Sequence, residues 1–165
     1  MSTAVMGKPI EILLVEDNPA DIRLAKEALK DGKVLNNLSV VTDGVEALNF
    51  VNQTGRYSDS PTPELILLDL NLPKKSGLEV LEFIKSDSEL KKIPIVMLTT
   101  SKAEEDIVRS YKLNANCYIT KPIDLKQFLE VVRAIEKFWL TIVTLPPTKE
   151  KIYERETDKS SAGRR

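Results

Sequence analysis

The segment 64–73, with the sequence ELILLDLNLP, constrains the fold of this chain more than any other segment. Its four consecutive apolar residues, 65–68, predict a strand buried on both faces, as strands of parallel sheets are. Asp69 follows directly, at the carboxyl edge where open parallel α/β sheets bind their ligands. From this segment alone, Asp69 is either a functional carboxylate or a residue that caps the turn after the strand.

The composition is typical of a soluble globular protein and excludes several kinds of chemistry. The 165 residues suffice for one domain, and 42% of them are hydrophobic and 30% charged. With 24 basic and 25 acidic residues the net charge is -1, so we expect no nucleic acid and no membrane surface as a partner. The absence of histidine excludes Ser-His-Asp and Cys-His catalysis and most zinc sites.

Three further features predict a cytoplasmic location. The single cysteine, Cys117, forms no internal disulfide, which suits a reducing compartment. The first eight residues lack the apolar core of a signal peptide. The chain also contains no apolar run long enough to cross a bilayer.

Strand and helix signals alternate along the chain. Five strands are expected at 10–15, 38–41, 65–68, 95–98 and 117–120. Helices are expected to begin at Asn18-Pro19, Asp43-Gly44, Ser76, Ser101 and Asp124, with capping boxes at Ser76–Glu79 and Ser101–Glu104. Their apolar faces are predicted to be Ile22, Ala25 and Leu29; Ala47, Leu48 and Val51; Val80, Leu81 and Ile84; Ile107, Val108 and Tyr111; and a stripe from Phe128 to Trp139. This alternation predicts an α/β fold with a parallel sheet, and no glycine-rich phosphate loop follows the first strand.

Polar residues that could carry chemistry follow four of the five strands. They are Glu16 and Asp17, Asp69, Thr99, and Lys121. If strands one and three are neighbours, three carboxylates converge and require protonation or a cation, for which Mg²⁺ is the hard ion that suits oxygen ligands. This set suits phosphoryl transfer onto Asp69, with Thr99 and Lys121 at the phosphoryl oxygens. Taken singly, each residue also fits an ordinary turn, strand end or solvated side chain.

Four ordered motifs resemble the receiver domain of two-component response regulators. They are Glu16-Asp17, the segment 69–73 (DLNLP), Leu98-Thr99 and the segment 118–122 (YITKP), and the resemblance spans about residues 10–140. It implies a flavodoxin-like (βα)5 three-layer sandwich with strand order 2-1-3-4-5. It also implies that Asp69 accepts a phosphoryl group from a sensor histidine kinase.

The resemblance further implies a role for each motif residue. Asp17 and Asp69 would bind Mg²⁺ directly, Glu16 through water and Asn71 by its backbone carbonyl. Thr99 and Lys121 would contact the phosphoryl oxygens, and Lys121-Pro122 would be a cis peptide. Thr99 and Tyr118 would switch the surface of helix four, strand five and helix five, although Tyr118 also fits a half-buried strand aromatic.

The protein is therefore not expected to be an enzyme beyond phosphorylation and dephosphorylation of its own aspartate. Thr100 stands where the family usually has a smaller residue. Its branched side chain is expected to obstruct the hydrolytic water and to slow self-dephosphorylation.

The expected domain organisation is a tail at 1–8, a receiver domain at 9–147 with an extended C-terminal helix, and a disordered polar tail at 148–165. The extension is apolar, with Phe138, Trp139, Ile142 and Leu145 as candidate interface residues. We expect a homodimer through helix four, strand five, helix five and this extension; the alternative is that the extension folds back on its own domain.

The extension, the segment 98–101 and the proline-containing loop before the third strand resemble one subgroup of the family. These are the single-domain regulators that partner cyanobacterial phytochrome-type light-sensing kinases. Two other functions stay open. A phosphatase of the haloacid-dehalogenase type normally needs a second acid two positions after its aspartate, where this chain has Asn71, and a phosphorylation-independent scaffold would need none of the acidic set.

Overall fold

The computed structural model describes residues 9–31, 35–110, 115, 117–121, 126, 127 and 130. Its strands are β1 (Ile10–Val15), β2 (Asn36–Val41), β3 (Leu65–Asp69), β4 (Ile95–Thr99) and β5 (Cys117–Thr120). Its helices are α1 (Pro19–Asp31), α2 (Gly44–Asn52), α3 (Gly77–Ser86) and α4 (Lys102–Ser110), with short 3-10 helices η2 (Gly55–Tyr57) and η3 (Leu90–Lys92). All of these elements belong to the first of two compact units, Met1–Leu129 and Glu130–Arg165.

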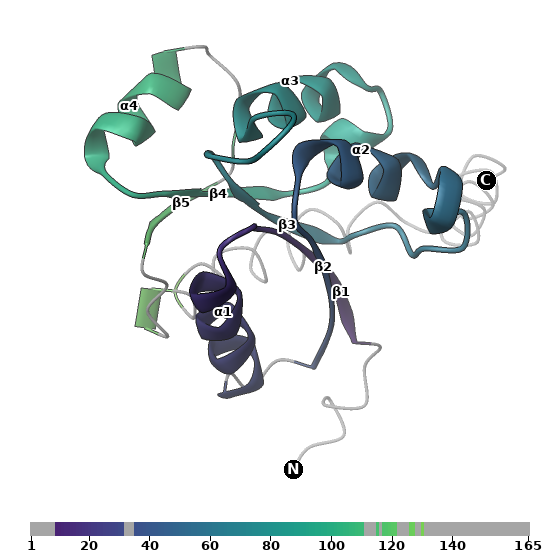
Figure 1. Ribbon diagram of the computed structural model, residues 1–165, viewed down its shortest axis with the longest axis horizontal. Coiled ribbons are helices and arrows are strands. Elements are labelled where there is room, and N and C mark those ends of the chain that lie inside the picture. Colours follow the sequence, from purple (N-terminus) through teal and green to yellow (C-terminus); the bar gives the residue numbers. More distant parts are fainter. Residues whose placement is uncertain are drawn as a thin grey trace, which may run out of the picture. The chain divides into compact units, whose positions relative to one another are not determined.

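The strands form one parallel sheet in the order β2-β1-β3-β4-β5, as predicted. Helix α1 lies on one side of the sheet, and α2, α3 and α4 lie on the other (Figure 1). The α/β class and the flavodoxin-like strand order are thereby confirmed. Because β1 is paired with β3 and β3 with β4, the residues that follow these three strands meet at one edge.

Strands β3 and β4 form the centre of the core. Every residue of both strands is buried, which explains their nearly continuous apolar sequences. The apolar stripe Val80, Leu81 and Ile84 of α3 is buried against the sheet, as its helical spacing predicts. The core therefore fixes β3, and with it Asp69, more firmly than any strand at the edge of the sheet.

The helix starts follow the predicted caps. Asn18 Oδ1 accepts hydrogen bonds from the backbone N–H groups of Ala20 and Asp21, and Pro19 is the first helical residue. Asp43 caps α2. Ser76 and Glu79 form the predicted reciprocal capping box at α3. Each of these helices thus begins within a few residues of the strand edge that carries the polar side chains.

Two predicted helix faces need correction. In α2 the buried stripe includes Phe50, and Leu48 is only partly buried at its margin. In α4, Val108 is fully buried whereas Ile107 is 52% exposed. Adjacent helical residues point about 100° apart, so a helix that meets the sheet along a narrow stripe buries one of the two and exposes the other.

Several predictions concern residues outside the described part of the chain. They are the tails 1–8 and 148–165, Tyr111, the Lys121-Pro122 peptide, the start of the fifth helix at Asp124, the apolar stripe from Phe128 to Trp139, and the interface residues Phe138, Trp139, Ile142 and Leu145.

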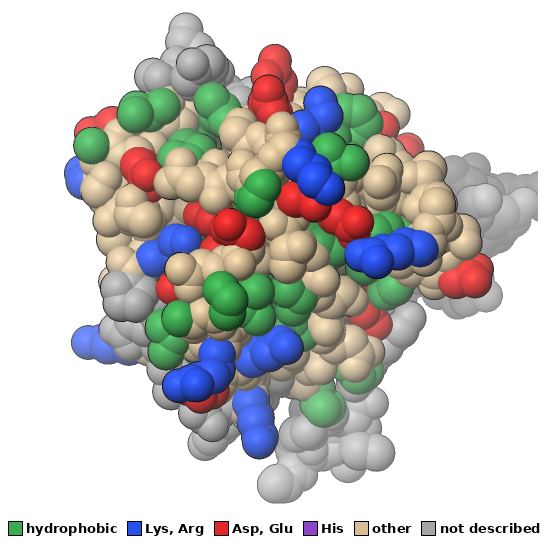
Figure 2. Space-filling model, in the orientation of Figure 1, with side chains coloured by type: hydrophobic (Ala, Val, Ile, Leu, Met, Phe, Trp, Pro, Cys, Tyr) green, Lys and Arg blue, Asp and Glu red, His purple; other side chains and the backbone are tan. Residues whose placement is uncertain are grey.

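The surface shows no dominant sign of charge on the face in view. Acidic and basic side chains both occur there, with hydrophobic side chains between them (Figure 2). Among the described residues, no helix combines the length and the apolar composition that crossing a membrane requires.

Candidate functional site

Three carboxylates meet where β1 and β3 end. Glu16 and Asp17 follow β1, and Asp69 is the last residue of β3. One oxygen from each of the three groups lies within 4.8 Å of the others. Glu16 and Asp69 are buried while Asp17 is exposed, so solvent reaches the cluster at Asp17. Three like charges at this separation repel one another strongly unless a cation or a proton offsets them.

Lys121 supplies one positive charge to this cluster. It follows β5, and its backbone N–H donates to the Thr99 carbonyl at 2.6 Å. Its Nζ donates to Glu16 Oε2 and to Asp21 Oδ2, both at 3.0 Å, and lies 3.3 Å from Asp69 Oδ1. Burial opposes the charged form, but the hydrogen bonds to Glu16 and Asp21 outweigh it and raise the pKa of Lys121. The side chain is therefore a fixed ammonium.

Sequence reasoning did not find Asp21. It lies in the first turn of α1, where acids are common because they favour the helix dipole, so its type and position gave no signal of a function. Its partner lies 100 residues away in the sequence, and only the fold brings the two together.

The environment of Asp69 favours its protonated form. Its side chain is almost fully buried, and that burial raises the pKa of Asp69 to about 7, with the nearby Glu16 carboxylate adding to the effect and Lys121 opposing it. Without a cation, the protonated form of Asp69 is therefore more strongly favoured than it is for an aspartate in water. A cation placed beside this carboxylate would lower its pKa and favour the ionised form.

Two buried polar atoms at this edge lack hydrogen-bond partners within the described part of the chain. They are Thr99 Oγ1 and Asp69 Oδ1, and the second of these has only its ion pair with Lys121 Nζ at 3.3 Å. Buried polar atoms without partners cost about 1–3 kcal/mol each and are rare in folded proteins. Thr99 offers a donor, and Asp69 offers an acceptor beside two further carboxylates. The oxygen-only donor set fits a hard divalent cation such as Mg²⁺ or Mn²⁺.

The start of α3 holds the backbone of Asp69 in place. The Gly77 N–H donates to the Leu70 carbonyl at 2.8 Å. A Cβ atom at Gly77 would lie 2.1 Å from the Asp69 carbonyl oxygen and 2.8 Å from the Leu70 Cα. Because real Cβ atoms do not approach this closely, only glycine allows α3 to begin against the end of β3.

The loops after β3 and β4 are joined by a single side chain. Asn71 Nδ2 donates to Glu104 Oε1 at 2.8 Å, and the Thr100 N–H donates to Glu104 Oε2 at 2.6 Å. Of the two hydrogen bonds of the predicted capping box at α4, one is present: Ser101 Oγ accepts from the Glu104 N–H at 3.3 Å. In place of the other, the Glu104 carboxylate accepts from the Thr100 N–H instead of the Ser101 N–H. The hydrogen bond from the Thr100 backbone lowers the pKa of Glu104, which keeps it ionised.

Tyr118 lies on β5, half-buried, with a cation above its ring. The Cζ atom of Arg109 lies 4.2 Å from the ring centroid, a cation–π distance. Arg109 is itself bound to Glu105 at 2.8 Å. The tyrosine ring is thus held at the surface between α4 and β5 by a charged side chain.

The chain is similar in sequence to a known family and to a named relative. The sequence model of the family described as "Response regulator receiver domain" matches residues 12–133, about three quarters of the chain. The sequence is 53% identical over 138 residues to "Response regulator Rcp1" of Synechocystis sp. (strain ATCC 27184 / PCC 6803 / Kazusa). That alignment covers 84% of this chain and 94% of Rcp1.

Solved structures give the same result for the fold. The Mn²⁺-bound form of response regulator Rcp1 is 52% identical and superposes with a TM-score of 0.68, covering 84% of this chain and all of that chain. The phosphorylated cyanobacterial phytochrome response regulator RcpA is 53% identical with a TM-score of 0.69, covering 85% of this chain and all of that chain.

Proposed function

Because this chain belongs to the response regulator receiver domain family, we propose that it accepts a phosphoryl group on Asp69 from a sensor histidine kinase. The observation that carries the proposal is the buried carboxylate of Asp69, whose Oδ1 atom has no hydrogen-bond partner among the described residues. It lies between two further acids and the ammonium of Lys121. A carboxylate in this position can act as a nucleophile once a cation and a phosphoryl group are bound beside it.

In the proposed reaction a carboxylate oxygen of Asp69 forms a bond to phosphorus, and the bond from phosphorus to the donor's imidazole nitrogen breaks. Thr99 and Lys121 would donate to the phosphoryl oxygens, where negative charge must be stabilised. Glu16, Asp17, Asp69 and the backbone carbonyl of Asn71 are the proposed Mg²⁺ ligands. The ion, when bound, would offset the repulsion among the carboxylates and the incoming anion.

The proposed switch uses Thr99 and Tyr118. Thr99 would move toward the phosphoryl group, and Tyr118 would turn inward into the space this leaves, changing the surface formed by α4, β5 and the predicted fifth helix. To invert a population ratio of about 1:99, phosphoryl group and metal together must favour the active form by about 5.5 kcal/mol. Support for this role of Tyr118 is its half-buried place at the boundary of α4 and β5.

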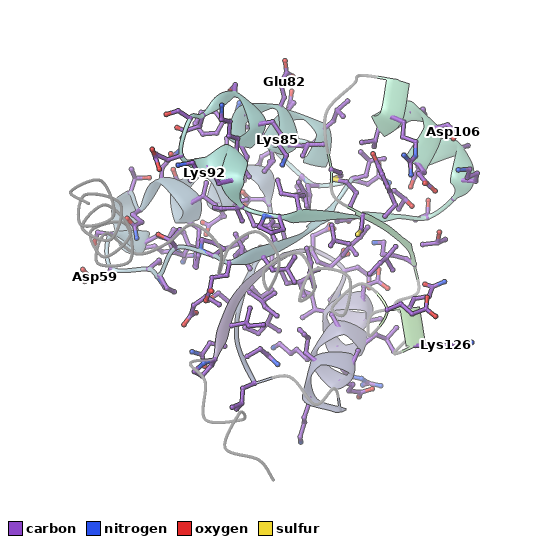
Figure 3. The ribbon with its side chains drawn as sticks, turned by 180° about the vertical axis from the view of Figure 1, so that it is seen from behind. Asp59, Glu82, Lys85, Lys92, Asp106 and Lys126 are labelled. Atoms are coloured by element: carbon purple, nitrogen blue, oxygen red, sulfur yellow. The ribbon has the colours of Figure 1, made fainter. Side chains whose placement is uncertain are left out.

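The first test is treatment of the protein with acetyl phosphate and Mg²⁺ followed by intact-mass measurement. We expect a gain of one phosphoryl group that is absent in Asp69→Asn. Asp59→Asn is the matched control, because Asp59 lies in the loop before β3 whereas Asp69 is the last residue of that strand. Asp59 also lies far from Asp106 of α4 (Figure 3). Continuous phosphate release over many turnovers would favour the phosphatase alternative, and an unchanged mass would favour the scaffold.

The proposed donor is a phytochrome-type light-sensing kinase in the cytoplasm, because RcpA is a cyanobacterial phytochrome response regulator at 53% identity. Phosphoryl transfer from such a kinase should exceed transfer from a histidine kinase with an unrelated sensor by at least about tenfold in rate, roughly 1.4 kcal/mol of discrimination. Equal rates from both kinases would contradict this pairing. Neither nucleic acid nor membrane is a proposed partner.

The proposed lifetime of the phosphorylated form depends on Thr100. Its branched side chain adjoins Thr99, and we expect it to obstruct the water that would hydrolyse the aspartyl phosphate. Thr100→Ala should therefore shorten the lifetime severalfold, measured by the decay of the phosphorylated mass after removal of acetyl phosphate. A lifetime equal to that of the unmodified sequence would end this idea.

We further propose that the receiver domain, residues 9–147, forms a homodimer. The apolar residues Phe138, Trp139, Ile142 and Leu145 of its extension would cross to the partner. Sedimentation of the double variant Trp139→Ala, Ile142→Asp should show the mass of a monomer. An unchanged mass would defeat the dimer and favour an extension that packs on its own domain.

A further inference from the structure

We propose that Glu104 is a positioning residue that opposes phosphorylation of Asp69. Its carboxylate joins the loop after β3 to the loop after β4 and holds both in the arrangement of the unphosphorylated protein. This inference rests on the proposed function of Asp69, and it adds a residue outside the acidic cluster to the control of that reaction.

The contacts of Glu104 exceed what a helix cap requires. A cap at α4 needs only the bond from the Glu104 N–H to Ser101 Oγ. The carboxylate makes two more bonds, to the Thr100 N–H at 2.6 Å and to Asn71 Nδ2 at 2.8 Å, and the second spans 33 residues of sequence. Both oxygens of one half-buried carboxylate therefore bind different loops of the site.

The two loops are the ones that a phosphoryl group on Asp69 would disturb. Asn71 is two residues after Asp69, and Thr100 directly follows Thr99, whose buried hydroxyl has no hydrogen-bond partner among the described residues. A phosphoryl group supplies acceptors for that hydroxyl, so it draws Thr99 toward Asp69. Movement of Thr99 displaces the Thr100 N–H from the carboxylate that now holds it.

Charge acts in the same direction. The phosphoryl group adds negative charge beside Asn71, and the ionised carboxylate of Glu104 is bound to that residue's side chain. A ligand shifts an equilibrium only by contacts that differ between the two states, and the contacts of Glu104 favour the unphosphorylated one. Removing them should therefore favour phosphorylation.

The experiment compares Glu104→Ala, which removes the bridge, with Glu104→Gln, which removes the charge. The glutamine can accept from the Thr100 N–H, and it can donate to Asn71 Oδ1 once the Asn71 amide, which now presents its Nδ2, has turned round. Asp106→Asn is the control for charge, because Asp106 lies on the same helix (Figure 3) and pairs only weakly with exposed Lys102 at 3.7 Å. The readouts are the rate of phosphorylation by acetyl phosphate in saturating Mg²⁺, the affinity for beryllofluoride, and the melting temperature.

We expect Glu104→Ala to raise the phosphorylation rate and the beryllofluoride affinity by roughly threefold to tenfold. On a logarithmic scale, the values for Glu104→Gln should lie at least halfway back from those of Glu104→Ala to those of the unmodified sequence. Asp106→Asn should match the unmodified sequence. In a double-mutant cycle, Asn71→Ala should raise the rate alone and add little to Glu104→Ala, since both remove one bridge.

Two results would overturn the inference: a folded Glu104→Ala whose rate is unchanged or slower, or a Glu104→Gln whose rate equals that of Glu104→Ala, which would leave charge alone as the cause. A lowered melting temperature without a faster rate would assign Glu104 to helix stability only. If the unmodified sequence gains no phosphoryl group at all, the proposed function of Asp69 fails instead.

Discussion

Two of the clusters of charged and hydroxyl side chains in the described part of the chain differ in how completely their members are paired. In the first, between α2 and η2, Arg56 donates to Glu46 Oε2 at 2.5 Å and to Tyr57 Oη at 2.6 Å, and Tyr57 donates to the same Glu46 oxygen. The second, at the carboxyl edge of the sheet, has three acids in contact with the ammonium of Lys121 and a fourth, Asp17, beside two of them. It contains buried atoms without hydrogen-bond partners among the described residues.

We interpret the difference as one between a structural cluster and the proposed functional site. The Glu46 cluster joins residues at most 11 positions apart, its charges balance, and the Arg56 side chain is 72% exposed. The carboxyl-edge cluster joins residues about 100 positions apart, its charges do not balance, and its central carboxylate is buried. Pairing completed within the protein stabilises the fold, whereas pairing left incomplete is available to a ligand.

The largest expected effect is the dependence of stability on pH through Asp69. Its folded-state pKa of about 7 lies above the ordinary 3.8, so its contribution to stability is complete below pH 3.8 and is lost as the pH rises through 7. At 1.4 kcal/mol per pKa unit, the loss is roughly 4 kcal/mol for the metal-free protein. Asp69→Asn should therefore unfold at higher urea concentration than the unmodified sequence at pH 8, with little difference at pH 4.

Addition of Mg²⁺ provides the control for this result. A cation that binds the folded state stabilises it, so Mg²⁺ should recover part of the lost free energy at pH 8 in the unmodified sequence and less in Asp69→Asn. Equal urea midpoints for the two proteins at pH 8 without metal would show that burial of Asp69 imposes no cost, and the comparison of the two clusters would lose its basis.

A smaller effect is expected from Asp21, the acid that the sequence did not reveal. Asp21→Asn replaces a charge-assisted bond to Lys121 with a weaker one, so we expect a loss of about 1–2 kcal/mol in the free energy of unfolding at pH 7. Glu27→Gln on the same helix is the control, because its pair with Arg23 is exposed at 3.7 Å and should contribute less than about 0.5 kcal/mol. Urea titration of both variants measures the difference.

The smallest effect is expected in the balanced cluster. Tyr57→Phe removes the hydroxyl shared by Glu46 and Arg56, and a loss of about 1 kcal/mol in unfolding free energy should follow because the site is partly solvated. The rate of phosphorylation by acetyl phosphate should not change. A change in that rate would mean that the two clusters are coupled and that the distinction between them is too simple.

The sequence predicted the fold well because its main signals are local. The buried run of β3, the caps at Asn18 and Ser76, and the alternation of strands with helices each depend on neighbouring residues, and together they place Asp69 and Lys121 at one edge. The prediction that Ile107 is buried was wrong, because helical spacing identifies an apolar stripe but does not determine how wide the contact with the sheet is.

The finer parts of the site depend on side-chain direction, which spacing does not determine. Asp21 is a typical first-turn acid until the fold brings Lys121 to it. Glu104 fits a capping box in sequence, but its carboxylate bonds Thr100 and Asn71, and the second partner comes from another loop. Contacts of this kind become visible only when the strands have been paired.

The backbone contact at Gly77 has a consequence for the proposed switch. Because Gly77 has no side chain, the start of α3 packs directly against the backbone of Asp69. Gly44 likewise packs against the backbone of the β3–α3 loop, where a Cβ would lie 2.1 Å from the Lys75 carbonyl oxygen. Both contacts are between backbones, which have no rotamers with which to yield. The β3 side of the site is therefore rigid, and if Asp69 gains a phosphoryl group as proposed, we expect the resulting displacement to occur toward β4 and α4 instead.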